Sequence, residues 1–402
     1  MRVSTAFNRM LCLPDTSVKA VDFTSDGIVV GVRLRKRKAL CPCGRWSKTT
    51  YDRSQRRWRH LDLAASKCWI SYAIRRIDCK ACDRVRTEVV PWARPSARHT
   101  RDFEDVIAWL CQRTDRTAVT RLMRVSWEGV TSIVKRVVGD HLDSDRLDNL
   151  LRIGVDEISY KTRSYLTVIS DHDTSSVVHV TPGRTSDSLN EFFTLLGPDR
   201  CTNIEAVSMD MAPIWQQPCE THIPDAVVCF DPFHVMAWVN RALDAVYMSH
   251  RNPFDNRRTW QKTRTSLRTA SETLSPERHR LITDATEIYA QLGLAWTLKE
   301  DFRDLYQTIK ADHANTYLQE WIDRARASGL KPFINLARRI NNHFDGIVAA
   351  VQHHLSNALA ENINARIRLI NKRGYGHHSP QTLTTMIYLC LGGINIKLPT
   401  QT

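Results

Sequence analysis

The sequence lacks the features that would place it in a membrane or among secreted proteins. The first ten residues carry charges at Arg2 and Arg9 and have no long apolar core, so they do not resemble a signal peptide. Charged residues interrupt every candidate membrane span. The eleven cysteines are scattered and odd in number, which argues against a disulfide framework. We therefore expect a soluble protein of a reducing cytoplasm.

Acidic residues are scarce relative to basic ones. The chain of 402 residues has 57 Lys and Arg against 43 Asp and Glu, which gives a net charge of +14. From Arg33 to His60 there are eleven Lys or Arg and one acid, Asp52. This balance favours a polyanionic partner such as nucleic acid, although a solvated positive face has the same composition.

Internal repeats and low-complexity tracts are also missing, and the length predicts more than one domain.

Residues 1–95 predict a small β-rich module. Strand-forming residues cover 27–34 and 67–77, and each run leads into a pair of cysteines. The pairs are Cys41 with Cys43 and Cys79 with Cys82. Four thiolates on two turns match a structural zinc site, which would stabilise a module with little core. The first pair is one residue tighter than usual, and four ordinary buried cysteines remain the alternative.

Residues 96–145 predict a helical module after a connector that contains Pro95. Apolar spacing predicts helices over 100–113, 117–123 and 127–138, the last capped by Ser126. Two short helices joined by a tight turn, with basic residues on the second, are typical of a DNA-binding helix-turn-helix. A generic three-helix bundle has the same pattern.

Residues 150–234 predict a mixed α/β unit, and residues 235–352 a helical insertion. The predicted strands are 152–158, 164–170, 176–181, 204–209 and 226–230, with a helix near 188–196. Short links predict a meander of the first three strands.

Strand signals vanish from 232 to about 355. The tryptophans there are Trp238, Trp260, Trp296 and Trp321; packing is favoured over base stacking.

Three carboxylates stand in distinctive settings within this part of the chain. Asp156 and Asp210 each follow a buried apolar run, and Glu361 lies on a predicted helix over 357–370. An unpaired carboxylate beside a buried strand would be costly, so Asp156 needs a metal or an arginine as partner. Together the three acids could hold two divalent metal ions for phosphodiester chemistry. Glu157, on the opposite side of the strand, is the alternative to Asp156.

Two further patterns surround these acids. Asp231 followed by Pro232 is a good start for a helix over 233–248, and His234 is then placed to support Asp231 or a metal site. The helix with Glu361 has an apolar face of Ala360, Ile363, Ile367 and Ile370, and a polar stripe of Asn357, Glu361, Asn364 and Arg368. Residues 371–378 form a basic, glycine-containing segment suited to DNA contact.

The ordered set of motifs resembles the bacterial DDE transposases of the insertion-sequence-L-three (ISL-three) family, nearly end to end. The motifs are the two cysteine pairs, the helix-turn-helix after 98–101, Gly154-Val155-Asp156-Glu157, Met209-Asp210-Met211, Phe230-Asp231-Pro232-Phe233-His234-Val235, Ser356-Asn357-x3-Glu361-Asn362-x-Asn364 and Arg373-Gly374-Tyr375-Gly376. Asn362 stands where the family often has glycine.

The resemblance implies a multidomain α/β protein: a zinc-ribbon-like module, a helix-turn-helix, and a ribonuclease-H-like catalytic core with an all-helical insertion, closed by a final catalytic helix and C-terminal segment over 353–402. It implies Asp156, Asp210 and Glu361 as the catalytic triad that binds two Mg²⁺ or Mn²⁺ ions, with Asp231, His234, Asn357 and Asn364 in support. It implies a structural Zn²⁺ on the four cysteines.

The implied activity is cleavage at terminal inverted repeats of an insertion sequence and strand transfer into target DNA, by a homodimer or larger synaptic assembly. The expected location is the bacterial cytoplasm, in association with the nucleoid and not with a membrane. The candidate DNA-binding residues are Arg35, Lys36, Arg37, Lys38, Arg56, Arg57, Arg59, Lys135, Arg136, Arg368, Lys372 and Arg373. A non-catalytic repressor derived from a transposase, and a nuclease that never transposes, are the alternative functions.

Overall fold

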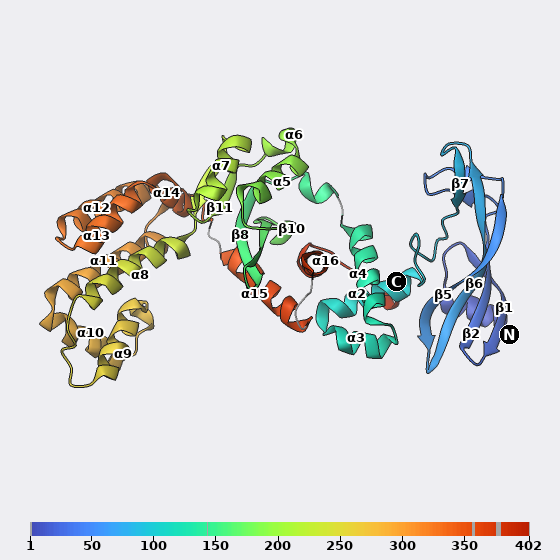
Figure 1. The fold of residues 1–402 in the computed structure, drawn as a ribbon, viewed down its shortest axis with the longest axis horizontal. Coiled ribbons are helices and arrows are strands. Elements are labelled where there is room, and N and C mark those ends of the chain that lie inside the picture. The colour runs from blue at the N-terminus through green and yellow to red at the C-terminus, as the bar shows by residue number, and fades with distance from the viewer. Residues whose placement is uncertain (1, 143, 356–357, 375–378, 402) are drawn as a thin grey trace. The chain divides into compact units, whose positions relative to one another are not determined.

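The computed structural model describes residues 2–142, 144–355, 358–374 and 379–401. The chain divides into two compact units (Figure 1). The first unit contains residues 1–143 and 370–402, and the second contains residues 144–369. Among the described residues, no helix is long and apolar enough to cross a membrane.

The first unit begins with a β module. Its elements are α1 (Val3–Leu11), β1 (Thr16–Thr24), β2 (Gly27–Leu34), β3 (Ala39–Leu40), β4 (Trp46–Ser47), β5 (Asp52–Leu63), β6 (Ser66–Cys79) and β7 (Arg84–Thr87). The main sheet has the order β1-β2-β6-β5, with β7 also paired to β6, and β3 and β4 form a small second sheet. The predicted strands at 27–34 and 67–77 are confirmed as β2 and β6, whereas α1, β1 and β5 were not predicted.

The core of this module lies on one face of the sheet. Val30, Trp58 and Ile70 are nearly fully buried and pack with Trp92, whose ring meets that of Trp58 edge to face at 5.8 Å. Burial of large aromatic and β-branched side chains supplies the apolar area that a small sheet needs. The module therefore has a hydrophobic core of its own as well as its cysteine cluster.

The helix-turn-helix follows as α2 (Arg101–Arg113), α3 (Arg116–Met123) and α4 (Trp127–His141). The three predicted helices are thus confirmed, with small differences at their ends. The side chain of Ser126 accepts a hydrogen bond from the backbone N–H of Gly129 at 3.1 Å, which confirms it as the cap of α4. Helix α16 (Pro380–Leu391) packs on α4 and α2, and Gln112 donates to the carbonyl of Leu389 at 2.7 Å.

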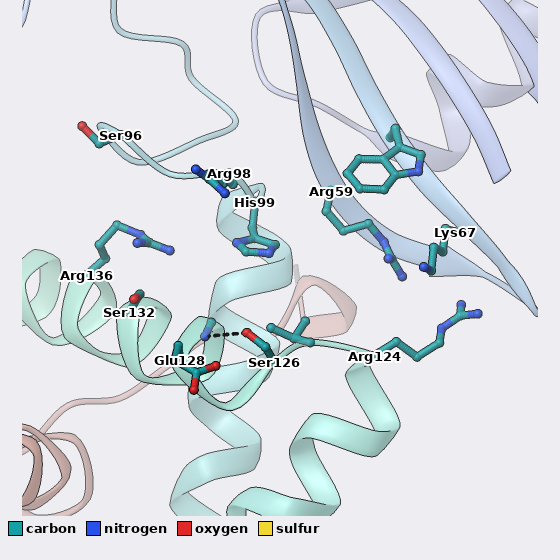
Figure 2. A pocket seen from close by; sticks show the side chains of 13 residues that line it. Arg59, Lys67, Ser96, Arg98, His99, Arg124, Ser126, Glu128, Ser132 and Arg136 are labelled. Atoms are coloured by element: carbon teal, nitrogen blue, oxygen red, sulfur yellow. Dashed lines mark hydrogen bonds between the residues drawn. The ribbon is translucent and has the colours of Figure 1, made fainter. Parts of the chain in front are cut away.

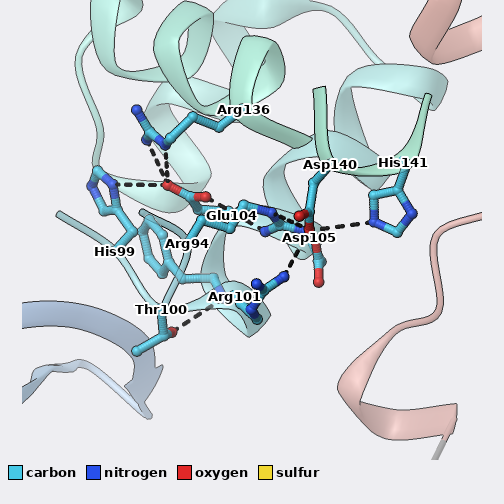
Figure 3. Close-up of polar contacts among 10 residues, drawn as sticks. Arg94, His99, Thr100, Arg101, Glu104, Asp105, Arg136, Asp140 and His141 are labelled. Atoms are coloured by element: carbon cyan, nitrogen blue, oxygen red, sulfur yellow. Dashed lines mark hydrogen bonds and ion pairs between the residues drawn. The ribbon is translucent and has the colours of Figure 1, made fainter. Parts of the chain in front are cut away.

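A buried ion network fastens the connector before α2 to the helices. Arg94, 3% exposed, donates to Asp105 at 2.6 Å and to Asp140 at 2.9 Å, and lies 3.5 Å from Glu104 (Figure 3). Arg136 also donates to Glu104, at 2.5 and 2.9 Å. Glu104 is fully buried, and a buried carboxylate is tolerated only when paired in this way.

The second unit is built on a mixed five-stranded sheet. Its strands are β8 (Arg152–Lys161), β9 (Ser164–Asp171), β10 (Ser176–Pro182), β11 (Ala206–Met209) and β12 (Val227–Phe230), in the order β10-β9-β8-β11-β12. The first three form the predicted antiparallel meander. Helices α5 (Ser186–Leu196), α6 (Pro198–Cys201) and α7 (Pro213–His222) provide the links to β11 and β12, which run parallel to β8.

The predicted helical stretch before the segment that carries Glu361 is confirmed. Its helices are α8 (Pro232–Met248), α9 (Arg257–Arg268), α10 (Pro276–Ile288), α11 (Ala290–Gln307), α12 (Ala314–Ala327), α13 (Lys331–Asn341) and α14 (Phe344–Gln352). Trp238, Trp260 and Trp321 are buried in its core and Trp296 packs against it, so the packing interpretation is confirmed. The core is continuous with that of the sheet.

Helix α15 (Ala358–Arg373) follows this stretch. Ala360, Ile363, Ile367 and Ile370 are all at most 7% exposed, so its predicted apolar face is confirmed. The elements η1 (Ser144–Leu147), η2 (Ser271–Thr273), η3 (Ala311–His313) and η4 (Pro399–Gln401) are short 3-10 turns.

Candidate functional site

Three aspartates share one level at the carboxyl ends of the parallel strands. Gly154 of β8 pairs with Ser208 of β11, so two residues further along Asp156 stands beside Asp210. Met209 pairs with Phe230 of β12, so Asp210 in turn stands beside Asp231. Neighbouring strands lie about 4.8 Å apart, which brings the three carboxylates to one edge of the sheet. Strand β8 continues to Lys161, beyond its predicted end at 158, and its last parallel pair with β11 is Gly154 with Ser208, so Asp156 follows the parallel pairing and lies within the strand.

Asp156 is bound to the helix that carries Glu361. Its Oδ2 accepts a hydrogen bond from Asn364 Nδ2 at 2.7 Å, and its Oδ1 accepts one from the backbone N–H of Glu157 at 2.8 Å. Burial raises the pKa of the Asp156 carboxyl from 3.8 to about 6. Among the described residues it has no cationic partner within ion-pair distance.

Glu157, the alternative to Asp156, has such a partner. Arg184, which was not predicted, places its Nε 3.0 Å from Glu157 Oε1. Burial raises the pKa of Glu157, while Arg184 opposes that shift and Asp210 adds to it. The negative charge of Glu157 is therefore compensated by Arg184. Asp156, in contrast, lacks the cationic partner that the sequence analysis predicted for it.

Asp231 and His234 form a hydrogen-bonded pair at the start of α8. The Asp231 side chain accepts from the backbone N–H of Phe233 at 3.2 Å, which confirms the predicted cap. Its Oδ2 lies 2.7 Å from His234 Nδ1, and this hydrogen bond raises the pKa of His234. Asp210 and Asp156 raise that pKa as well, so the imidazole lies within the field of all three acids.

Asn364 contributes a second polar atom to the same place. It is 7% exposed, and its Oδ1 has no hydrogen-bond partner among the described residues. A buried, unsatisfied amide oxygen costs about 1–3 kcal/mol, so such an atom points to a missing partner. Glu361 lies one turn earlier on α15 and is exposed, as is Arg368 one turn later; Asn357 lies outside the described residues.

The donor set fits a hard divalent cation. Carboxylates of Asp156 and Asp210 and the free oxygen of Asn364 are the ligand types that Mg²⁺ and Mn²⁺ prefer. The three acids of the predicted triad do not converge tightly here. Among the described residues, the one group of metal-ligating side chains whose ligand atoms all lie within 4.8 Å of one another is a different one.

That group is the cysteine cluster of the first unit. Cys41 Sγ lies 3.8 Å from Cys82 Sγ, and Cys43 Sγ lies 3.7 Å from Cys79 Sγ. Backbone amides, that of Cys82 first, lower the pKa of Cys79 to about 6, while burial raises that of Cys41 to about 12. The four sulfurs, drawn from two turns, are compatible with a zinc site despite the tight spacing of the first pair.

The predicted DNA-binding residues are mostly exposed. Arg35, Lys36, Arg37, Lys38, Arg57, Lys135, Arg368, Lys372 and Arg373 are exposed, and Arg56 and Arg136 are half-buried. Arg59 is different, because it is only 5% exposed. Three more basic residues were missed by the sequence reasoning: Lys67, Arg98 and Arg124 line a cleft together with Arg59 and Arg136. They come from three separate segments of the chain, so no local spacing indicates them.

Comparisons with known proteins find similar sequences over most of the chain. Residues 153–387 match the sequence profile of the ISL3-type DDE transposase family, and residues 88–138 match the helix-turn-helix domain of transposase family ISL3. The transposase for insertion sequence element IS1557 of Mycobacterium tuberculosis is 35% identical over 94% of this chain and 92% of its own length. The transposase for insertion sequence element IS1001 of Bordetella parapertussis is 24% identical over 85% of this chain and 86% of its own.

Proposed function

Since the chain belongs to the ISL3 family of transposases, we propose that it is a DNA-cleaving and strand-transfer enzyme whose triad is Asp156, Asp210 and Glu361. The observation that carries the proposal is the hydrogen bond between Asn364 and Asp156, because it joins the helix of Glu361 to the strand-end acids. The sheet order and the helical stretch before α15 also support the proposed ribonuclease-H-like core with an insertion.

In the proposed reaction, water attacks a phosphodiester at the element end. A new P–O bond forms, the bond to the leaving 3′-oxygen breaks, and that oxygen departs as a 3′-hydroxyl. In strand transfer the 3′-hydroxyl attacks a target phosphate in the same manner. Two bound Mg²⁺ or Mn²⁺ ions would supply activation of the nucleophile and stabilisation of the leaving oxygen.

The protein's own residues prepare this site. Asp156 and Asp210 provide fixed ligand oxygens from two adjacent parallel strands, and Glu361 provides a third from α15. Asn364 holds Asp156 in place, and Asp231 holds His234 beside the acids. The acidic neighbours raise the pKa of His234 and so favour its protonated form, whose positive charge would offset part of theirs.

DNA recognition would come from the first unit. The helix-turn-helix and the cysteine-bearing β module are proposed to bind the terminal inverted repeats, with zinc holding the two cysteine turns together. Basic residues would supply affinity that falls with salt. The two ends of an element must be processed together, so we propose a homodimer or larger synaptic assembly in the cytoplasm, associated with the nucleoid.

The experiment is an excision and cleavage assay on a plasmid that carries the gene with its native flanking DNA. Wild type and Glu361→Gln are compared with and without Mg²⁺, and Glu320→Gln, an exposed glutamate of α12, is the matched control. Metal-dependent breaks at the flanks that only Glu361→Gln loses support the proposal. Flank binding without breaks in wild type would favour a repressor instead.

A further inference from the structure

A basic cleft separates the tip of the β5–β6 hairpin from the turn of the helix-turn-helix (Figure 2). Its volume is about 570 Å³, and its walls belong wholly to the first unit. The cations that line it are Arg59, Lys67, Arg98, Arg124 and Arg136, and Glu128 is the one acid among the lining residues. The sheet supplies Arg59 and Lys67, the connector supplies Arg98, the turn after α3 supplies Arg124, and α4 supplies Arg136.

The positive charge in this cleft is only partly neutralised within the protein, where Arg136 is paired with Glu104. Asp62 is shared between two guanidinium groups, since it accepts from Arg59 and also from Arg124 Nε at 3.0 Å. One carboxylate between two arginines leaves an excess positive charge. Lys67 and Arg98 have no ion-pair partner among the described residues, so they add to that excess.

The buried Arg59 keeps hydrogen-bonding capacity beyond its ion pair with Asp62. Its side chain is 6% exposed, it lines the cleft, and its Nε has no hydrogen-bond partner among the described residues. Its guanidinium lies over the ring of Trp69, 5.5 Å from the centroid, which fixes the group at the cleft wall. A buried arginine with incomplete hydrogen bonding is costly unless a partner arrives.

The amino terminus of α4 opens onto the same space. Ser126, the cap of this 15-residue helix, lines the cleft together with Gly129 and Ser132. Helix amino termini favour anions through their free N–H groups and the helix dipole. The cleft thus combines cationic side chains, hydroxyl donors and a helix terminus, which is the donor set that a phosphate accepts.

We propose that this cleft binds the sugar-phosphate backbone of one DNA strand, so that the β module and the helix-turn-helix grip the same strand. A duplex is too wide for a cleft of about 570 Å³, so a single backbone is the part of the DNA that this cleft would take. The inference rests on the proposed function as a DNA-binding transposase and names the surface that holds the DNA. Backbone contacts position the protein and give affinity without sequence preference.

The test uses the full-length double variant Lys67→Gln with Arg98→Gln. Neither side chain has an ion-pair partner among the described residues, so the fold should persist, which thermal unfolding checks. Binding is measured over a salt series on the duplex that flanks the gene and on a scrambled duplex of equal length. The matched control is Arg9→Gln with Lys19→Gln, two exposed cations of the same β module outside the cleft.

We expect the cleft variant to lose affinity on the order of tenfold for both duplexes, and its salt slope to fall by about two, while the control stays near wild type. A variant with wild-type affinity and slope would overturn the inference. A loss confined to the flanking duplex would also overturn it, because that result indicates base reading.

A variant that removes a negative charge from the cleft, and should therefore raise DNA affinity, completes the design. Glu128 is the exposed acid in the cleft, so Glu128→Gln should raise affinity several-fold on both duplexes, beyond the effect of Asp22→Asn, an exposed acid on β1. No gain beyond Asp22→Asn would contradict the inference. If wild type binds both duplexes alike and does not cleave, the proposed function fails; the cleft is still tested on the scrambled duplex.

Discussion

Asn364 Nδ2 donates a hydrogen bond of 2.7 Å to Asp156 Oδ2, across 208 positions of the chain. This bond attaches α15 to the edge of the sheet where three aspartates stand in register. It also leaves the amide oxygen, Oδ1, buried and without a hydrogen-bond partner among the described residues. The pair therefore supplies carboxylate and amide oxygens of the kind that the proposed divalent cation would bind.

The Asn364→Ala variant tests the role of this bond. We expect DNA cleavage to fall on the order of tenfold to hundredfold, because outer-shell partners of metal ligands contribute by that amount. DNA affinity should stay unchanged, since the bond lies in the second unit. Asn362→Ala is the matched control, because Asn362 is exposed on the same helix. Equal activity of the two variants would show that the bond does not serve the reaction.

The cysteine cluster predicts about one zinc ion per chain. Cys79→Ser should abolish zinc binding and unfold the two cysteine-bearing turns, because their sulfurs would lose the metal ion that joins them. Metal content by atomic emission and circular dichroism of the purified chain measure both effects. Cys12→Ser, at an exposed cysteine outside the cluster, should change neither. Full zinc content in Cys79→Ser would exclude that cysteine as a ligand.

Two histidines make the first unit sensitive to acid. Burial lowers the pKa of His60 and of His99 from 6.5 to about 4. Between pH 6.5 and 4 the unfolded chain therefore binds more protons than the folded one, so stability falls as the pH falls through this window. The expected loss is about 1–3 kcal/mol per histidine.

Thermal unfolding between pH 7.5 and 4 measures this dependence. His60→Gln should flatten the curve below pH 6.5, whereas His353→Gln, at an exposed histidine, should leave it unchanged. A pH dependence that is identical in His60→Gln and wild type would contradict the burial argument.

Arg94 is predicted to be essential for the fold of the helix-turn-helix. Arg94→Ala removes a cation from three carboxylates, including the fully buried Glu104, and should cost about 3–5 kcal/mol. Arg101→Ala, which loses a single exposed pair with Asp140, should cost less than about 1 kcal/mol. Urea unfolding of both variants decides the matter, and equal costs would contradict the assigned role of Arg94.

Local patterns explain why the helices and the central strands could be predicted. The caps at Ser126 and Asp231, the apolar face of α15 and the meander after β8 all depend on residues close in sequence. Strand β5 was not predicted, because its half between Asp52 and Arg57 is polar and basic. It acquires its place by pairing along β6, which is a tertiary contact.

Long-range partners could not be predicted in the same way. The stripe of α15 marks Glu361 and Asn364 as neighbours, but only the fold shows that Asn364 is buried against Asp156 while Glu361 is exposed. Likewise, Arg184 meets Glu157 through the arrangement of the sheet and the loop before α5. Such pairs depend on the packing of segments that lie far apart in the sequence, and no local periodicity indicates which of these segments will meet.

The most direct test of the proposed triad replaces one ligand with a softer one. Asp210→Cys is assayed for cleavage of the flanking duplex with Mg²⁺ and with Mn²⁺, beside wild type and Asp225→Cys, which alters an exposed aspartate before β12. Thiolate is a poor ligand for Mg²⁺ and is better tolerated by Mn²⁺. If Asp210 binds the catalytic metal, Asp210→Cys is inactive with Mg²⁺ and regains cleavage with Mn²⁺, while Asp225→Cys behaves as wild type. Wild-type cleavage by Asp210→Cys in Mg²⁺ would contradict the triad.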